Sequence, residues 1–192
     1  MSEQSAKERR AKQTVNNLLL SLLATAGLVL LIILVVPRDE SNRIPHINYN
    51  AVAAQAAASS KLPIIAPELP KGWWANNATW FENPVDAVPR FEAGFVGPNN
   101  NTYIGLVEGF DVNPTWSALN LKDVVLEKNY QNSGSLVKWS IYKSAEVHNP
   151  PKSRDEIWVA TFGNNQILIY GTAAKSSFVA FTQTIEQKLA GK

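Results

Sequence analysis

The sequence predicts an α+β fold: an antiparallel sheet of about five to seven strands with segregated helices, preceded by one transmembrane helix. Three observations support this prediction: an uncharged apolar segment near the N-terminus, several short stretches of alternating apolar and polar residues, and segments with helical spacing of apolar residues. Hairpins combined with separate helices give an α+β antiparallel sheet. With 192 residues, of which 45% are hydrophobic, the chain can form one modest globular domain.

The apolar segment runs from Leu18 to Val36, LLLSLLATAGLVLLIILVV, and its only polar residues are Ser21 and Thr25. At about 1.5 Å per residue it comes close to the roughly 30 Å hydrocarbon core of a bilayer. A cleavable signal peptide has an apolar stretch of only about 7 to 15 residues, followed by a cleavage site with small residues. The one such triplet, at 24–26, lies inside the apolar segment. We therefore expect a retained signal anchor.

Positive charge is concentrated before this segment. Of the 18 Lys and Arg and 16 Asp and Glu residues, four bases and two acids precede residue 38, which leaves fourteen of each in the rest of the chain. The positive-inside rule then predicts a cytoplasmic N-terminus in a single-pass protein of the cell membrane. The neutral C-terminal part makes a nucleic-acid-binding surface unexpected. The expected organisation is a basic cytoplasmic tail at 1–17, the transmembrane helix at 18–36, a tether at 37–47 and an extracytoplasmic α+β domain at 48–192.

The tether is polar, short and bounded by prolines, so we expect the domain to lie near the membrane surface. An alanine-rich stretch follows, and the spacing of its larger and smaller apolar residues predicts a first helix with a narrow face. Small side chains favour packing against the domain, with partner contact as the alternative. The residues on this face are Tyr49, Val52, Ala53, Ala56 and Ala57.

The next stretch, LPIIAPELPKGWW at 62–74, contains three prolines. Each proline fixes φ and keeps its predecessor out of the helical region, so the segment should be extended. We expect its apolar residues to lie along the domain and Gly72 to turn the chain toward the first strand. Those apolar residues are Leu62, Ile64, Ile65 and Leu69.

Five strands are predicted from alternation or from short apolar runs. Residues 90–97 and 102–110 should form a hairpin around the turn PNNN, and residues 136–143 should form a strand with one solvated face. Residues 157–162 and 166–172 are apolar on both faces and are joined by GNN, which predicts a central hairpin covered on both sides. Glycines inside these strands, at positions 94, 105, 109 and 171, indicate bulges or close backbone approach.

Two further helices are predicted. One opens at Asn113-Pro114-Thr115 and continues through the helical spacing of Leu121, Val124, Val125 and Lys128 toward the turn NSGS at 132–135. The other is a C-terminal amphipathic helix at 175–190. Its apolar face consists of Phe178, Phe181, Ile185 and Leu189.

No catalytic set is evident. Cysteine is absent, and the two histidines, His46 and His148, lie in unrelated loops, so neither a metal site nor a cofactor is expected. The loop NSGSL lacks the Gly-x-Ser-x-Gly spacing of a nucleophilic serine, and nothing in the sequence pairs His148 with a serine. The sequence therefore predicts no catalytic residue.

The six tryptophans are unusual for a chain of this length. Trp139 and Trp158 lie in apolar strand patterns and are expected in the core. Exposure is more plausible for the four at segment ends, which are Trp73, Trp74, Trp80 and Trp116. Exposed rings could stack on a glycan or grip a peptide, so Trp73 and Trp74 are the candidate partner contacts. Core packing or anchoring at the membrane interface is the favoured alternative.

Four stretches in a fixed order carry a family resemblance: AKQTVNNLLLSLL, INYNAVAAQA, PIIAPELPKGWW and LIYGTA. Together they resemble the actinobacterial family of single-pass membrane proteins catalogued as a domain of unknown function. The Pro-Gly-Trp element, Pro67 to Trp73, is the most specific part. The resemblance implies a cytoplasmic tail, one span and an extracytoplasmic domain, and it brings no activity, cofactor or active-site residue.

These observations favour a non-enzymatic, membrane-anchored extracytoplasmic domain that binds or organises another component of the cell envelope, either a protein or a cell-wall glycan. The alternative is an envelope hydrolase or small-ligand carrier with a cleft that the sequence does not reveal. In a hydrolase, His148 would lie within hydrogen-bond reach of a serine or a carboxylate.

Overall fold

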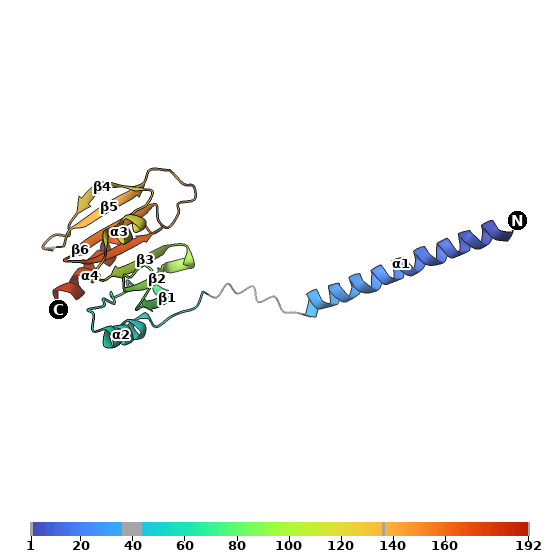
Figure 1. The fold of residues 1–192 in the computed structure, drawn as a ribbon, viewed down its shortest axis with the longest axis horizontal. Coiled ribbons are helices and arrows are strands. Elements are labelled where there is room, and N and C mark those ends of the chain that lie inside the picture. The colour runs from blue at the N-terminus through green and yellow to red at the C-terminus, as the bar shows by residue number, and fades with distance from the viewer. Residues whose placement is uncertain (1, 36–43, 136, 192) are drawn as a thin grey trace. The chain divides into compact units, whose positions relative to one another are not determined.

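The computed structural model describes residues 2–35, 44–135 and 137–191, and the chain divides into two compact units, residues 1–43 and 44–192 (Figure 1). The first unit contains helix α1 (Ser2–Val35). Its 24-residue segment Lys12–Val35 is long and apolar enough to cross a membrane. Side chains such as Leu18 and Leu34 are exposed in the structure, as is typical of a helix whose apolar surface can contact lipid. Val36 and the tether residues 37–43 lie outside the described residues.

The second unit is a seven-stranded sheet with three α-helices. The strand order is β1-β2-β3-β7-β6-β5-β4, and every neighbouring pair is antiparallel. The prediction of an α+β antiparallel sheet with one preceding apolar helix is thereby confirmed. The strands are β1 (Trp74–Phe81), β2 (Arg90–Val96), β3 (Tyr103–Gly109), β4 (Val124–Tyr130), β5 (Trp139–Ser144), β6 (Glu156–Phe162) and β7 (Asn165–Gly171), and the helices are α2 (Tyr49–Ser60), α3 (Pro114–Asn120) and α4 (Lys175–Ala190), with a short 3-10 turn η1 (Pro98–Asn100).

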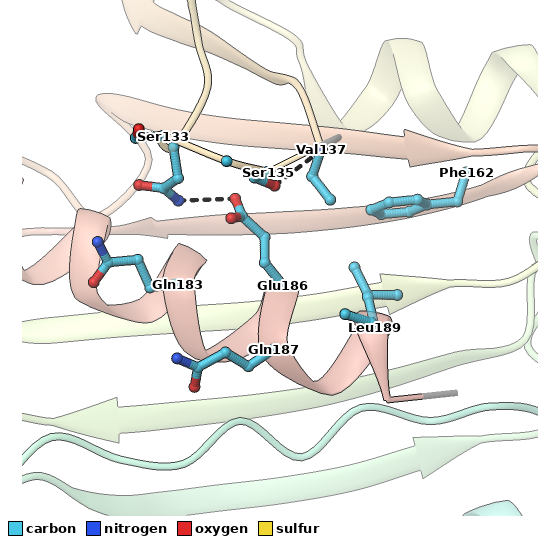
Figure 2. Close-up of a pocket in the computed structure, with 11 residues that line it drawn as sticks. Ser133, Ser135, Val137, Phe162, Gln183, Glu186, Gln187 and Leu189 are labelled. Carbon is cyan, nitrogen blue, oxygen red and sulfur yellow. Dashed lines mark hydrogen bonds between the residues drawn. The ribbon is translucent and has the colours of Figure 1, made fainter.

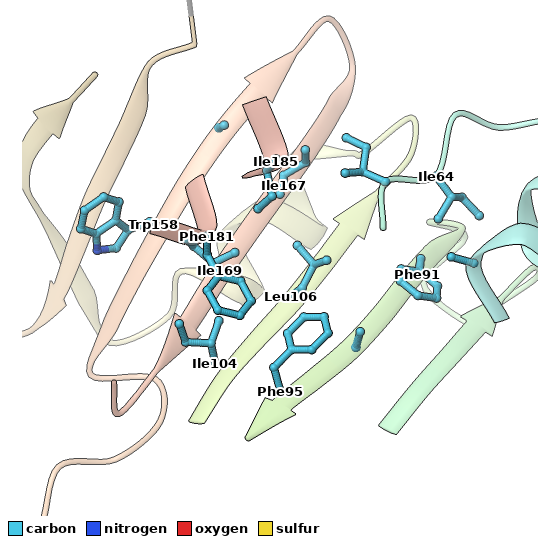
Figure 3. Close-up of a cluster of buried hydrophobic side chains, with 14 of the residues drawn as sticks. Ile64, Phe91, Phe95, Ile104, Leu106, Trp158, Ile167, Ile169, Phe181 and Ile185 are labelled. Atoms are coloured by element: carbon cyan, nitrogen blue, oxygen red, sulfur yellow. The ribbon is translucent and has the colours of Figure 1, made fainter. Parts of the chain in front are cut away.

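One face of the sheet carries the main core, which is built with side chains of α2 and α4 (Figure 3). The predicted apolar face of α4 is confirmed, because Phe178, Phe181 and Ile185 are buried. Trp139 and Trp158, which the strand patterns placed in the core, are fully buried. The predicted hairpins β2–β3 and β6–β7 are also confirmed, and β7 occupies the centre of the strand order.

The opposite face carries a smaller cluster under α3. It contains Val107, Trp116, Val159 and Leu168, so the central hairpin is covered on both sides as predicted. Trp116 is only 3% exposed, so core packing, the favoured interpretation for the tryptophans at segment ends, holds for this one. Its ring packs where a side chain on Gly109 would lie, 2.7 Å from an ideal Cβ, so this glycine permits the close approach of α3.

The helix predicted from Asn113 to about residue 131 is wrong beyond its first two turns. Asn113 does cap a helix, because its side chain accepts a hydrogen bond from the Trp116 N–H at 2.8 Å. That helix ends at Asn120, and Asp123 then turns the chain with φ of 64° into β4. Residues 124–130 are β-branched or aromatic at three of their seven positions, and pairing with β5 satisfies the backbone of that strand. Tertiary pairing therefore overrides the helical spacing.

Strand β1 was not predicted, because a bulge hides its alternation. Asn76 and Asn77 together face Gly94 on β2, and the register shifts between Ala75 and Asn77. A Cβ on Gly94 would lie 2.4 and 2.5 Å from the amide oxygens of Asn77 and Asn76. The extra residue breaks the two-residue period on which strand prediction depends. The first strand therefore begins at Trp74 and not at Arg90.

The proline segment packs along the main core as predicted, with Ile64 and Ile65 buried. It is also held by hydrogen bonds: the Ile65 N–H donates to Oε2 of Glu108 at 2.8 Å, and the Tyr49 hydroxyl donates to the Pro67 carbonyl at 2.5 Å. The φ of Gly72 is 83°, which confirms the turn into β1.

Candidate functional site

The structure places Trp73 and Trp74 at the junction of the proline segment and β1. Trp73 is half-buried and packs edge-to-face on Phe181, with ring centroids 5.1 Å apart. Trp74 is half-buried and stacks on His46 at 3.9 Å and an interplanar angle of 5°. Nearby, the Ile47 N–H donates to the Ala75 carbonyl at 2.8 Å, which attaches residues 44–48 to the edge of the sheet. A partner contact through Trp74 stays a prediction.

His148 lies in the loop between β5 and β6, next to two carboxylates. Its Nδ1 is 2.8 Å from Oδ1 of Asp155, and its Nε2 is 3.4 Å from Oε2 of Glu146. The other oxygen of Asp155 accepts the Lys152 N–H at 2.7 Å. Ser144 lines the same cavity of about 330 Å³, but its hydroxyl oxygen accepts the Glu146 N–H at 3.1 Å. Within the described residues, these contacts order the loop without joining His148 to a serine.

A larger groove, of about 850 Å³, lies where the β4–β5 loop meets the last turns of α4 (Figure 2). In Figure 2, polar side chains including Ser133 and Gln183 lie on one side of Glu186, and the apolar side chains Val137, Phe162 and Leu189 lie on the other. The described lining consists of Asn132, Ser133, Gly134, Ser135, Val137, Phe162, Gln183, Glu186, Gln187, Leu189 and Ala190.

A buried carboxylate lies in the wall of this groove. Glu186 is only 9% exposed, and its Oε1 accepts hydrogen bonds from Asn132 Nδ2 at 2.8 Å and from Trp139 Nε1 at 2.7 Å. Asn132 also donates to the Thr182 hydroxyl at 3.0 Å and accepts from the Tyr130 hydroxyl at 2.7 Å. The network joins β4, β5, their loop and α4, so the carboxylate is held in one orientation.

The sequence offered one weak signal for this network. Thr182 and Glu186 are four residues apart on α4 and lie beside the apolar positions Phe181 and Ile185, so two polar residues interrupt the buried stripe of the helix. Asn132, the partner of Thr182, is 50 residues away from it, and Trp139, a partner of Glu186, is 47 residues away from it. No local pattern connects residues at such separations.

Glu186 is the only ionisable residue in the described lining of the groove. The base nearest in sequence, Lys188, is directed elsewhere: its Nζ lies 2.9 Å from Oε1 of Glu68. The hydrogen bond from Lys188, together with its charge, lowers the pKa of Glu68. The groove therefore carries a negative charge that no described lining cation offsets.

The remaining polar groups do not add a metal site. Among the described residues, no group of three or more His, Asp or Glu side chains is placed to hold a metal ion.

On the second face of the sheet, burial and the neighbouring Tyr170 hydroxyl raise the pKa of Tyr103. The Tyr170 ring is in turn covered by the guanidinium of Arg154, 4.6 Å from the ring centroid.

Comparison with protein-family models identifies a family for most of the chain. The model of a family described as "Protein of unknown function (DUF4245)" matches residues 10–185. No curated protein and no solved structure matches the chain.

Proposed function

Because the chain belongs to the DUF4245 family of proteins of unknown function, we propose its role from its own structure: a membrane-anchored domain that binds another component of the cell envelope through the groove beside Glu186. The apolar segment of α1 supports the anchor. The base-rich tail before it supports a cytoplasmic N-terminus and an extracytoplasmic domain, with boundaries near residues 18, 36 and 48.

The observation that carries this proposal is the held orientation of Glu186. Two N–H donors fix Oε1, and the groove around it has amide and hydroxyl groups on one side and apolar side chains on the other. Concave sites with a few fixed polar groups against an apolar wall are typical of ligand binding. The described lining offers no second acid, histidine or base for proton transfer, so the groove favours binding over catalysis.

The test is site-specific photocrosslinking in cells that produce the full chain. A photoreactive phenylalanine analogue replaces Ser133 or Gln187, both exposed at the groove, and a control replaces Val85, whose side chain is fully exposed in the β1–β2 loop. We expect one envelope component to be crosslinked from both groove positions and not from Val85. Once identified and purified, that component should bind the full chain in detergent. Equal crosslinking from Val85, or none from the groove, would contradict the proposal.

A hydrolase is the second candidate, and the contact between His148 and Asp155 favours it. A histidine oriented by a carboxylate is one part of the arrangement that general-base activation needs, and Ser144, which would have to turn toward His148, lines the same cavity. The full chain should then hydrolyse p-nitrophenyl acetate, and Ser144→Ala and His148→Asn should each abolish this activity. Hydrolysis at the uncatalysed rate, or equal activity in both variants, eliminates the candidate.

A further inference from the structure

The groove has the electrostatics of a cation site. Its described lining contains the carboxylate of Glu186 and no Lys, Arg or His. Both hydrogen bonds to Oε1 come from neutral donors, the Asn132 amide and the Trp139 indole, so they orient the carboxylate without neutralising it. No described residue donates to Oε2. A ligand that donates a hydrogen bond to Oε2 would supply the donor that this oxygen lacks among the described residues, and a cationic donor would form the strongest such bond.

The end of α4 adds to this negative potential. Gln187, Leu189 and Ala190 belong to the last turn of the helix and line the groove. The aligned peptide dipoles of a helix place partial negative charge at its C-terminal end, which favours a cation nearby, and here the Gly191 N–H caps the Gln187 and Leu189 carbonyls without adding a positive charge. The one base in this turn, Lys188, is committed to Glu68. Two independent features, the carboxylate and the helix end, therefore favour the same sign of ligand charge.

The apolar wall defines what carries the cation. Val137, Phe162 and Leu189 lie together beside Glu186 (Figure 2). Such a wall suits an alkyl stem, and the Phe162 ring can also face an ammonium group. The amide of Gln183 and the hydroxyl of Ser133 lie on the opposite side, where peptide N–H and C=O groups would find partners.

We propose that the groove binds a lysine-type side chain, a primary ammonium on an alkyl stem, presented by an extended peptide. This assignment rests on the proposed binding function and specifies its ligand. The ammonium contacts Oε2 of Glu186, the stem lies on the wall of Val137, Phe162 and Leu189, and the peptide backbone contacts the polar side of the groove.

The Trp139 indole provides a direct reporter, because its N–H donates to the same carboxylate at 2.7 Å. The full chain in detergent micelles is labelled with ¹⁵N, and Trp139→Phe identifies the Trp139 indole resonance among those of the six tryptophans. The probe is the tripeptide acetyl-Ala-Lys-Ala-amide. Its matched control replaces lysine by norleucine, which keeps the stem and removes the charge. Glucosamine serves as an ammonium without an alkyl stem.

The lysine peptide should shift the Trp139 indole resonance in a saturable manner, and the norleucine peptide and glucosamine should bind at least tenfold more weakly. Glu186→Gln keeps the size and one acceptor oxygen but removes the charge, so it should weaken binding at least tenfold. Should that variant unfold, Gln187→Lys introduces a competing ammonium at an exposed position without touching the network, and it should weaken binding similarly. Ser176→Lys, at the other end of α4, is the charge control and should bind like the unmodified chain.

Several outcomes would overturn the assignment: no shift with the lysine peptide, equal binding of the norleucine peptide or glucosamine, or full binding by both Glu186→Gln and Gln187→Lys. If these occur while groove crosslinks still form, the groove is a binding site for another chemistry and the proposed function stands. If the lysine peptide binds as expected but no component is crosslinked from the groove, the ligand class stands and the envelope-binding function fails.

Discussion

The buried carboxylate of Glu108 accepts a hydrogen bond from the backbone N–H of Ile65, at 2.8 Å, and so ties the proline segment to the third strand of the sheet. Glu108 is 2% exposed and Ile65 is 4% exposed. An extended segment with three prolines makes few backbone hydrogen bonds of its own, so this contact fixes its position across the core.

Replacing Glu108 with alanine should therefore lower the free energy of unfolding by about 2 kcal/mol or more, because the Ile65 N–H is left buried without its acceptor. Denaturant unfolding followed by tryptophan fluorescence measures the change. The control is Glu146→Ala, whose side chain is 84% exposed and which should change stability by less than about 0.5 kcal/mol. Equal stability of the two variants would show that the contact does not hold the segment.

Two glycine substitutions should differ in cost. A Cβ on Gly171 would lie 2.0 Å from the carbonyl oxygen of Tyr103, which is backbone of the paired strand, whereas a Cβ on Gly94 would meet only the ends of side chains. Backbone in a paired strand yields less readily than a side-chain amide. We expect Gly171→Ala to cost about 1 to 3 kcal/mol and Gly94→Ala clearly less. Thermal unfolding of both variants gives the order, and the reverse order would refute this account.

Stability should fall at alkaline pH because of Tyr103. Burial, with the Tyr170 hydroxyl nearby, raises the pKa of Tyr103 above its ordinary value near 10. The folded state therefore keeps this proton where the unfolded state has lost it, so the stabilisation is complete below about pH 10 and decreases as pH rises above that value. Tyr103→Phe should make the free energy of unfolding less dependent on pH between 9 and 11. An unchanged slope would contradict the predicted shift.

The loop that carries His148 should depend on Asp155 for its order. Asp155 accepts from the Lys152 N–H and contacts His148 through its two oxygens. Asp155→Ala removes both contacts, so limited proteolysis should cleave between residues 145 and 155 several-fold faster. Glu146→Ala, which removes only the longer contact to His148, is the matched control. Equal cleavage rates in the two variants would show that Asp155 does not order the loop.

The sequence predicted secondary structure correctly where apolar residues recur at one regular spacing along a whole element. The hairpins β2–β3 and β6–β7 and the helix α4 have regular apolar patterns, and their predicted residues agree with the structure to within about two positions. Strand β4 was misread, because Leu121, Val124, Val125 and Lys128 also fit helical spacing and only pairing with β5 decides between the two.

The groove could not be predicted from local sequence patterns, for a different reason. Asn132 and Glu186 are 54 residues apart, and a polar residue in a loop and another on a helix have no shared period. Their proximity follows from the order of the strands, which brings the β4–β5 loop to the end of α4. Chain topology therefore determines the site, and topology was predicted only as a fold class.

The contacts of residues 44–48 with β1 also have a mechanical meaning. A pull on the chain from its N-terminal side first loads the bond between Ile47 and Ala75 and the ring stack of His46 on Trp74. Only after these contacts break does the load pass to helix α2 and the proline segment, both packed on the main core, and then to the ladder between β1 and β2. One hydrogen bond and one stacked pair should yield before a ladder of seven paired residues. Residues 44–48 would then be free to extend, and at about 3.3 to 3.6 Å per residue they span roughly 17 Å. Single-molecule force spectroscopy should record this small extension before the domain unfolds. A weak pulling force would then lengthen the connection to the domain and leave its sheet intact.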